Sequence, residues 1–101
     1  TFTFQRPTDG LDIITDFSSN DTLQFSAAGF GGDLVPTDGL SGSDYRLGSN
    51  PRPNNGGSTF LFNASSRTLS FDVDGRGSGA AVDIAIFEGR HNPKASQIEI
   101  V

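Results

Sequence analysis

Two aspartates separated by one residue, Asp72 and Asp74, stand before a loop with glycine at alternate positions: Gly75, Gly77 and Gly79. Glycine reaches backbone conformations with positive φ that other residues avoid, so this loop can bend its carbonyl oxygens toward one point. Calcium binds about six to eight oxygen atoms from carboxylates, backbone carbonyls and water. The residue types and their spacing therefore indicate a calcium site in this loop.

A third carboxylate follows the loop, in a run where Val82, Ile84 and Ile86 alternate with Asp83 and a small residue. Alternation places Asp83 on the polar face of a strand, from which it could approach Asp72 across a hairpin. The pattern differs from an EF-hand loop, because glycine directly follows the second aspartate and no glutamate stands at the closing position. The alternative is an acidic, solvated hairpin loop in which Asp-Gly serves turn geometry.

Residues for nucleophilic catalysis are scarce. The chain has no cysteine, which excludes thiolate chemistry and cysteine-ligated zinc, and His91 is its single imidazole. His91 lies in a predicted turn and is expected to be exposed to solvent. No Glu-Asp pair is marked by spacing, so a nucleophilic triad lacks convincing members. We therefore predict that the protein is not an enzyme.

The acidic composition of the chain argues against some classes of binding partner. Twelve acidic residues against seven Lys and Arg give a net charge of -5 over 101 residues. Nucleic acids and anionic membranes need clustered basic residues, so neither is an expected partner. No apolar run approaches the roughly 18 residues of a membrane span. The length fits one domain, residues 1–101, which we expect to be the C-terminal β domain of a longer chain.

The elements that must position the aspartates are strands. Alternation of apolar and polar residues predicts strands at residues 1–5, 10–17, 22–26, 44–48, 60–62, 68–73, 82–86 and 96–101, and residues 63–66 form a turn. Residues 27–30 can form at most one helical turn. These strands predict an all-β fold with the following side chains facing one interior: Phe60, Phe62, Leu69, Phe71, Val82, Ile84, Ile86 and Ile98. Asp16 and Asp21 are expected to bind the backbone of the turn at 18–20.

The sequence resembles haemolysin-type (RTX) calcium-binding proteins at both ends. Residues 10–14, GLDII, fit the second half of the nonapeptide G-G-x-G-x-D-x-U-x, whose Asp binds calcium in a parallel β-roll. Residues 60–101 are similar to the module that follows such repeats, as in serralysin-like C-terminal regions, with a Phe-rich hairpin and an Asp-x-Asp-Gly-x-Gly loop. The chain departs from this pattern at residues 7–9, PTD, where glycines are expected, and at Gln97, where an acidic residue is expected.

The resemblance implies a fold of β-roll-like N-terminal strands joined to an antiparallel β-sandwich-like C-terminal part. It implies a calcium-binding, secretion-related module that caps the repeats of a secreted, extracellular protein. Its partners would be upstream domains of the same chain and a type I secretion machinery. Asp12 matches the aspartate that successive turns of the β-roll share as a calcium ligand. Residues upstream of this sequence would complete the coordination shell of that calcium ion.

A second hypothesis from the sequence is a binding module for carbohydrate or another surface. It would use the loops at residues 31–57, around Phe30 and Tyr45. A calcium titration followed by a stability measurement separates the two hypotheses.

Overall fold

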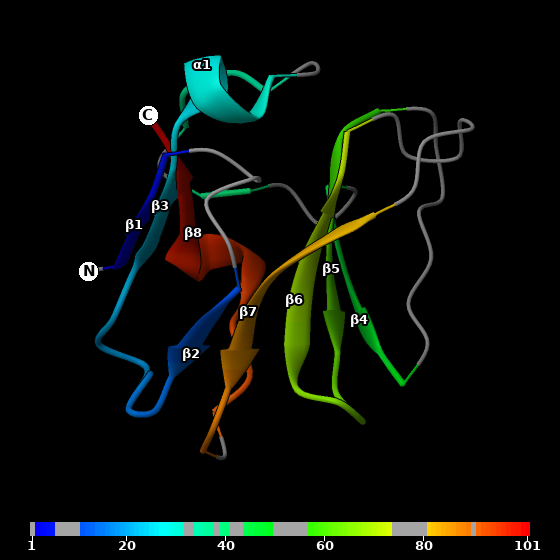
Figure 1. Cartoon of the computed structure of the whole chain (residues 1–101). Coiled ribbons are helices and arrows are strands. Elements are labelled where there is room, and N and C mark those ends of the chain that lie inside the picture. The colour runs from blue at the N-terminus through cyan, green and yellow to red at the C-terminus, as the bar shows by residue number, and fades with distance from the viewer. Residues whose placement is uncertain are drawn as a thin grey trace.

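The computed structural model describes residues 2–5, 11–31, 34–37, 39–40, 44–49, 57–73, 81–89 and 91–101 (Figure 1). In these residues the chain forms eight strands: β1 (Phe2–Phe4), β2 (Asp12–Ile14), β3 (Leu23–Phe25), β4 (Tyr45–Gly48), β5 (Thr59–Asn63), β6 (Thr68–Asp72), β7 (Val82–Phe87) and β8 (Ile98–Ile100). A single helical turn, α1 (Ala27–Phe30), follows β3, and a 3-10 turn, η1 (Ala95–Gln97), precedes β8. The predicted all-β class is confirmed.

The smaller sheet joins the two ends of the chain. Its order is β1-β3-β8, and both pairings are parallel and in register. One row across this sheet is apolar and buried: Phe4, Phe25 and Ile100. The neighbouring row is polar, with Gln24 donating to the Glu99 carboxylate at 2.7 Å and Thr3 donating to the Gln24 amide oxygen at 3.3 Å. This alternation divides the sheet into a core face and a polar face.

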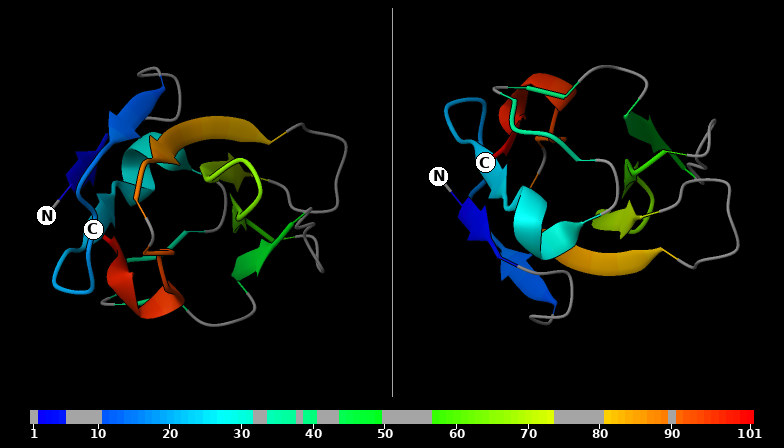
Figure 2. Two further views of the ribbon diagram at one scale, coloured as in Figure 1. Left: turned by 90° about the horizontal axis from the view of Figure 1, so that it is seen from below. Right: turned by 90° about the horizontal axis from the view of Figure 1, so that it is seen from above.

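The larger sheet has the order β2-β7-β6-β5-β4. Its central strands β5, β6 and β7 are consecutive and antiparallel, as predicted for the C-terminal part, whereas the outer pairs β4–β5 and β2–β7 are parallel. The predicted turn after β5 is present, because the Asn63 side chain accepts hydrogen bonds from the backbone N–H groups of Ser65 and Ser66. Figure 2 shows both sheets curving around a common interior.

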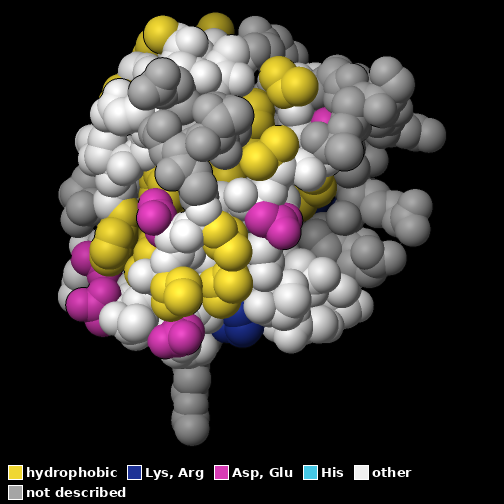
Figure 3. Space-filling view, in the orientation of Figure 1, with side chains coloured by type: hydrophobic (Ala, Val, Ile, Leu, Met, Phe, Trp, Pro, Cys, Tyr) yellow, Lys and Arg dark blue, Asp and Glu magenta, His cyan; other side chains and the backbone are white. Residues whose placement is uncertain are grey.

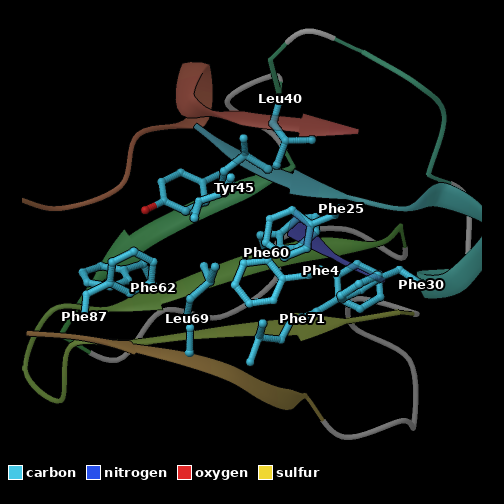
Figure 4. Close-up of a cluster of buried hydrophobic side chains, with 14 of the residues drawn as sticks. Phe4, Phe25, Phe30, Leu40, Tyr45, Phe60, Phe62, Leu69, Phe71 and Phe87 are labelled. Atoms are coloured by element: carbon cyan, nitrogen blue, oxygen red, sulfur yellow. The ribbon is translucent and has the colours of Figure 1, made fainter. Parts of the chain in front are cut away.

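The interior is filled mainly by phenylalanine (Figure 4). Phe25 of the smaller sheet contacts Phe60 of the larger sheet, with ring centroids 4.6 Å apart. Phe60 contacts Phe71 at 4.8 Å, and Phe30 of α1 meets Phe71 edge-on at 5.3 Å. The α1 turn is closed by the Ser26 hydroxyl, which accepts a hydrogen bond from the Gly29 N–H. The predicted helical turn thus serves to carry an aromatic side chain into the core.

Two residues of the predicted core, Val82 and Ile86, are not fully buried, and a β-bulge explains the position of Ile86. Val82 is 41% exposed and Ile86 is only partly buried, whereas Ile84, Ala85 and Phe87 are buried. The β6–β7 register shifts between Leu69 and Ser70, so that one extra residue is present on β7. A bulge changes which residues of a strand point inward, because two residues then oppose one on the partner. Simple alternation therefore fails after position 84.

The bulge predicts different costs for the same substitution at two positions of β7. Ile84→Ala should lower the free energy of unfolding by about 2–5 kcal/mol, because it leaves a cavity in the core. Ile86→Ala removes a partly exposed side chain and should cost less than half as much. Urea denaturation of both variants measures these values. Equal losses would show that the two residues contribute to the same packed face.

Candidate functional site

Two of the predicted calcium ligands, Asp72 and Asp83, share the polar face of the β6–β7 hairpin. Asp83 pairs with Ser70, whose hydroxyl donates to the Asp83 Oδ1 at 2.7 Å. Phe71 points into the core, so Ser70 and Asp72 on either side of it point to the opposite face. Asp72 and Asp83 are therefore diagonal neighbours, a relation in which residues stand about 7–8 Å apart. A cation can lie between two such carboxylates, with its remaining oxygen ligands supplied by other groups.

These two carboxylates have different surroundings. Asp72, at the end of β6, is 6% exposed and pairs with the fully buried Thr59, whereas Asp83 is exposed. A buried charge is costly unless a compensating charge or hydrogen bonds meet it. Asp74, the second aspartate of the predicted loop site, lies outside the described residues, as do Gly75, Gly77 and Gly79. The structure thus places one buried and one exposed carboxylate beside the predicted loop.

Asp12 lies apart from that pair. It pairs with Ala85 across β2 and β7, and Ala85 points into the core. Asp12 is therefore on the opposite face of the sheet from Asp83. Its side chain lines a groove of about 360 Å³ between β1 and β2, together with Phe4 and Ile14. Among the described residues, no group of three or more Asp, Glu, His or Cys side chains is close enough to hold a metal ion.

The turn at 18–21 uses its aspartate as predicted for Asp21. The Asp21 carboxylate accepts hydrogen bonds from the Ser18 N–H at 3.0 Å and from the Ser18 hydroxyl at 3.2 Å. The Asp21 N–H in turn donates to the Ser18 carbonyl. This aspartate stabilises a turn, which accounts for its place between two strands.

Gln97 ties that turn to the C-terminal strand. Its amide nitrogen donates to the carbonyls of Ser18 and Asp21 at 3.0 and 2.9 Å, and its amide oxygen accepts from the Lys94 N–H at 3.2 Å. The same oxygen lies 2.8 Å from His91 Nε2. An amide is required here because one side chain must donate and accept. This explains why glutamine, and not an acidic residue, occupies position 97.

His91 is half-buried and does not have the exposed position expected from the sequence. Its ring packs against Phe17, with centroids 5.6 Å apart, in addition to its hydrogen bond with Gln97. Its backbone carbonyl accepts from the Arg67 guanidinium at 3.0 Å. His91 therefore belongs to a structural network that fixes the segment before η1.

A groove of about 540 Å³ lies between β4 and the segment that contains His91. Its apolar lining residues are Tyr45, Leu47, Pro93 and Ala95. Its polar or basic lining residues are His91, Asn92 and Lys94. The Tyr45 hydroxyl donates to the Pro93 carbonyl at 2.5 Å, so its ring spans the groove. Burial raises the pKa of the Tyr45 phenol above its ordinary range. Sequence reasoning missed this groove, because its two walls are far apart in the chain and share no motif.

The aromatic residues named for a carbohydrate- or surface-binding module are in the core. Phe30 is 4% exposed and Tyr45 is 8% exposed, and Phe30 packs against Phe25 and Phe71. Stacking of a sugar ring requires an accessible aromatic face. Neither side chain presents one.

No protein-family model, no curated protein and no solved structure matches this chain. The resemblance to haemolysin-type modules therefore rests on the sequence motifs alone. Within the part of the chain that the structure describes, no helix is long and apolar enough to span a membrane.

The Gln97 network predicts a pH-dependent defect for the nearly isosteric Gln97→Glu. At pH 7 the introduced carboxylate would face two carbonyl oxygens, and we expect a loss of about 2–4 kcal/mol in the free energy of unfolding. The introduced carboxyl group, once protonated, can donate one hydrogen bond, so the folded state favours the proton. The loss should therefore grow as pH rises from about 4 to 7. Urea denaturation at both pH values measures it, and Gln97→Leu, which cannot titrate, should show no such change. A Gln97→Glu variant as stable as the parent at pH 7 would contradict the network.

Tyr45, the sole tyrosine, predicts a loss of stability at high pH. Burial raises the pKa of its phenol in the folded state, while in the unfolded chain the phenol has a pKa of about 10. Above that pH the unfolded state binds fewer protons, so the free energy of unfolding should decrease as pH rises. The phenolate absorbance should appear together with loss of the native circular dichroism. Reversible ionisation near pH 10 in a protein that stays folded would contradict the buried hydroxyl.

Proposed function

We propose that this chain is a non-catalytic, calcium-binding C-terminal module of a secreted bacterial protein of the haemolysin type. It caps a β-roll built by upstream residues of the same polypeptide, and its route to the outside is a type I secretion machinery. The observation that carries the proposal is the pair Asp72 and Asp83, which share one face of the hairpin that flanks the Asp-Gly loop. Calcium is the ion to which clustered carboxylate and carbonyl oxygens are best suited.

Charge compensation supplies the mechanism. The chain carries a net charge of -5, and Asp72 is only 6% exposed. Repulsion between carboxylates therefore opposes closure of the β6–β7 hairpin when calcium is scarce. An ion between the two carboxylates offsets that repulsion, so binding and folding become linked. Inside a calcium-poor cell the chain stays unfolded and can be exported. Outside, millimolar calcium drives it to the folded state.

The smaller sheet supports the capping role. Its strands are parallel and in register, with an apolar row beside the polar row of Thr3, Gln24 and Glu99. β1 is the outer strand of this sheet in the described residues. A further parallel strand from upstream residues can extend both rows, because Phe2 and Phe4 bond to the β3 side and alternation directs the backbone groups of Thr3 to the outer edge. Asp12, in the groove beside β1, would then share an ion with the upstream turn.

Calcium should stabilise the protein through the aspartates of the β6–β7 hairpin. The free energy of unfolding should rise as RT ln(1 + [Ca]/Kd), or about 2.7 kcal/mol at a hundredfold excess over Kd. Magnesium should substitute poorly, since it demands a tighter octahedral shell and releases water reluctantly. Thermal unfolding in calcium, magnesium and chelator measures this response.

The double variant Asp72→Asn with Asp74→Asn keeps the side-chain shapes and removes two charges. It should lose the calcium response and be no less stable than the parent in chelator, because repulsion is also removed. Asp12→Asn is the matched control on the opposite face of the sheet, and it should keep the response. If Asp12→Asn alone abolishes the response, the ion is bound at β2. A parent protein that does not respond to calcium at all would overturn the proposal.

A further inference from the structure

The backbone of β4 presents hydrogen-bonding groups to the groove that Tyr45 spans. β4 is the outer strand of the larger sheet in the described residues, and β5 covers one of its edges. The carbonyls of Asp44 and Gly48 accept from N–H groups of β5 and of the residue that follows it, at 2.9 and 2.8 Å. Alternation along a parallel strand then directs the backbone groups of Tyr45 and Leu47 to the other edge. Both residues also line the groove.

The groove offers an exposed apolar side chain, Leu47, against which an added strand can pack. Leu47 pairs with the buried Phe62, so its side chain points to the inner side of the sheet, yet it is 53% exposed. Tyr45 is two positions earlier on β4, so its side chain points to the same side of the sheet. Its hydroxyl bonds to the Pro93 carbonyl on the opposite wall and closes the bottom of the groove. A volume of about 540 Å³ holds several side chains of an extended peptide.

The surroundings of the groove are cationic, although the chain as a whole is acidic. Arg46 on the outer face of β4 and Lys94 on the far wall are both exposed. Behind that wall, the Arg67 guanidinium donates to the backbone carbonyls of Phe87 and His91 and to the Asn92 side chain, and it lies 5.2 Å from the Phe62 ring. All of these partners are neutral, so the charge of Arg67 stays uncompensated by them. Among the described residues, no Asp or Glu lines the groove.

We infer that this groove binds an extended acidic peptide segment, which adds to β4 as a further strand. Backbone hydrogen bonds to Tyr45 and Leu47 supply affinity, and alternate side chains supply specificity. Apolar side chains of the ligand point down onto the exposed side chain of Leu47, whereas its carboxylates point outward, toward Arg46 and Lys94. The preferred ligand therefore alternates acidic and apolar residues. This inference is independent of calcium binding and of the capping role.

Fluorescence anisotropy with labelled peptides tests the inference on the whole chain. The probe is a peptide that alternates Glu and Val, and its control replaces every Glu by Lys. We expect the Glu peptide to bind at least about tenfold more tightly and to weaken as salt rises, because exposed charges are screened. Equal affinity of the two peptides would overturn the inference. Binding should be the same in calcium and in chelator, which separates this result from the fate of the calcium proposal.

Protein variants locate the binding site. Leu47→Glu places a like charge in the groove and should weaken binding at least about tenfold. The matched control is Leu11→Glu, because Leu11 is 50% exposed but precedes β2 and does not line the groove. Replacing Arg46 and Lys94 together by Glu should weaken binding as strongly, with unchanged thermal unfolding. Equal loss in both single variants, or no loss in any, would place the ligand elsewhere and overturn the inference.

Two further measurements identify the binding mode and the occupant. Methylating the backbone nitrogens of every second residue in the Glu-Val peptide removes the donors that face β4, and this should abolish binding. Full affinity of both alternately methylated peptides would overturn strand addition. Analytical ultracentrifugation should show a monomer at every concentration. Self-association that Leu47→Glu abolishes would show that the occupant is a second copy of this chain and would overturn a separate acidic partner.

Discussion

The contact between Phe25 and Phe60 is the constraint on which the rest of the structure depends. It joins the two sheets at a centroid distance of 4.6 Å, and both side chains are fully buried. Its neighbours extend it in both directions, through Phe4 in the smaller sheet and Phe71 in the larger one. Several strands have three residues and form few hydrogen bonds of their own. Burial of large aromatic side chains therefore provides the main driving force, and the strands are held in place by the core that they enclose.

Polar side chains hold turns and connecting segments in place around the aromatic core. Gln97 fixes the turn at 18–21 to the C-terminal strand, and Arg67 fixes the segment before η1 to the end of β7. Arg67 adopts a positive φ of 59°, at the last position of the β5–β6 turn. Each of these side chains donates hydrogen bonds to two backbone carbonyls. They act as substitutes for secondary structure in a chain with long connecting segments.

The two proposed binding regions have opposite electrostatic character. The Asp72–Asp83 face of the β6–β7 hairpin gathers carboxylates, whereas the groove beside β4 is surrounded by Arg46, Lys94 and the guanidinium of Arg67. Figure 3 shows acidic and hydrophobic side chains interspersed on one side of the molecule. With carboxylates at one place and the described cations Arg46, Arg67 and Lys94 at another, the protein can attract a cation at the first and an acidic segment at the second without the two sites competing.

The sequence by itself determined the all-β class, the antiparallel hairpins β5–β6 and β6–β7, and the single helical turn at Ala27–Phe30. It also determined the turn role of Asp21. These features depend on neighbouring residues, so period-two alternation and turn chemistry are enough to predict them. The tertiary structure alone decided that β1, β3 and β8 form one sheet, and that Asp12 lies on the other face from Asp83. It also decided the bulge that turns Ile86 away from the core and the meeting of Tyr45 with Pro93. Each of these depends on contacts between segments distant in the chain, for which a single sequence carries no local signal.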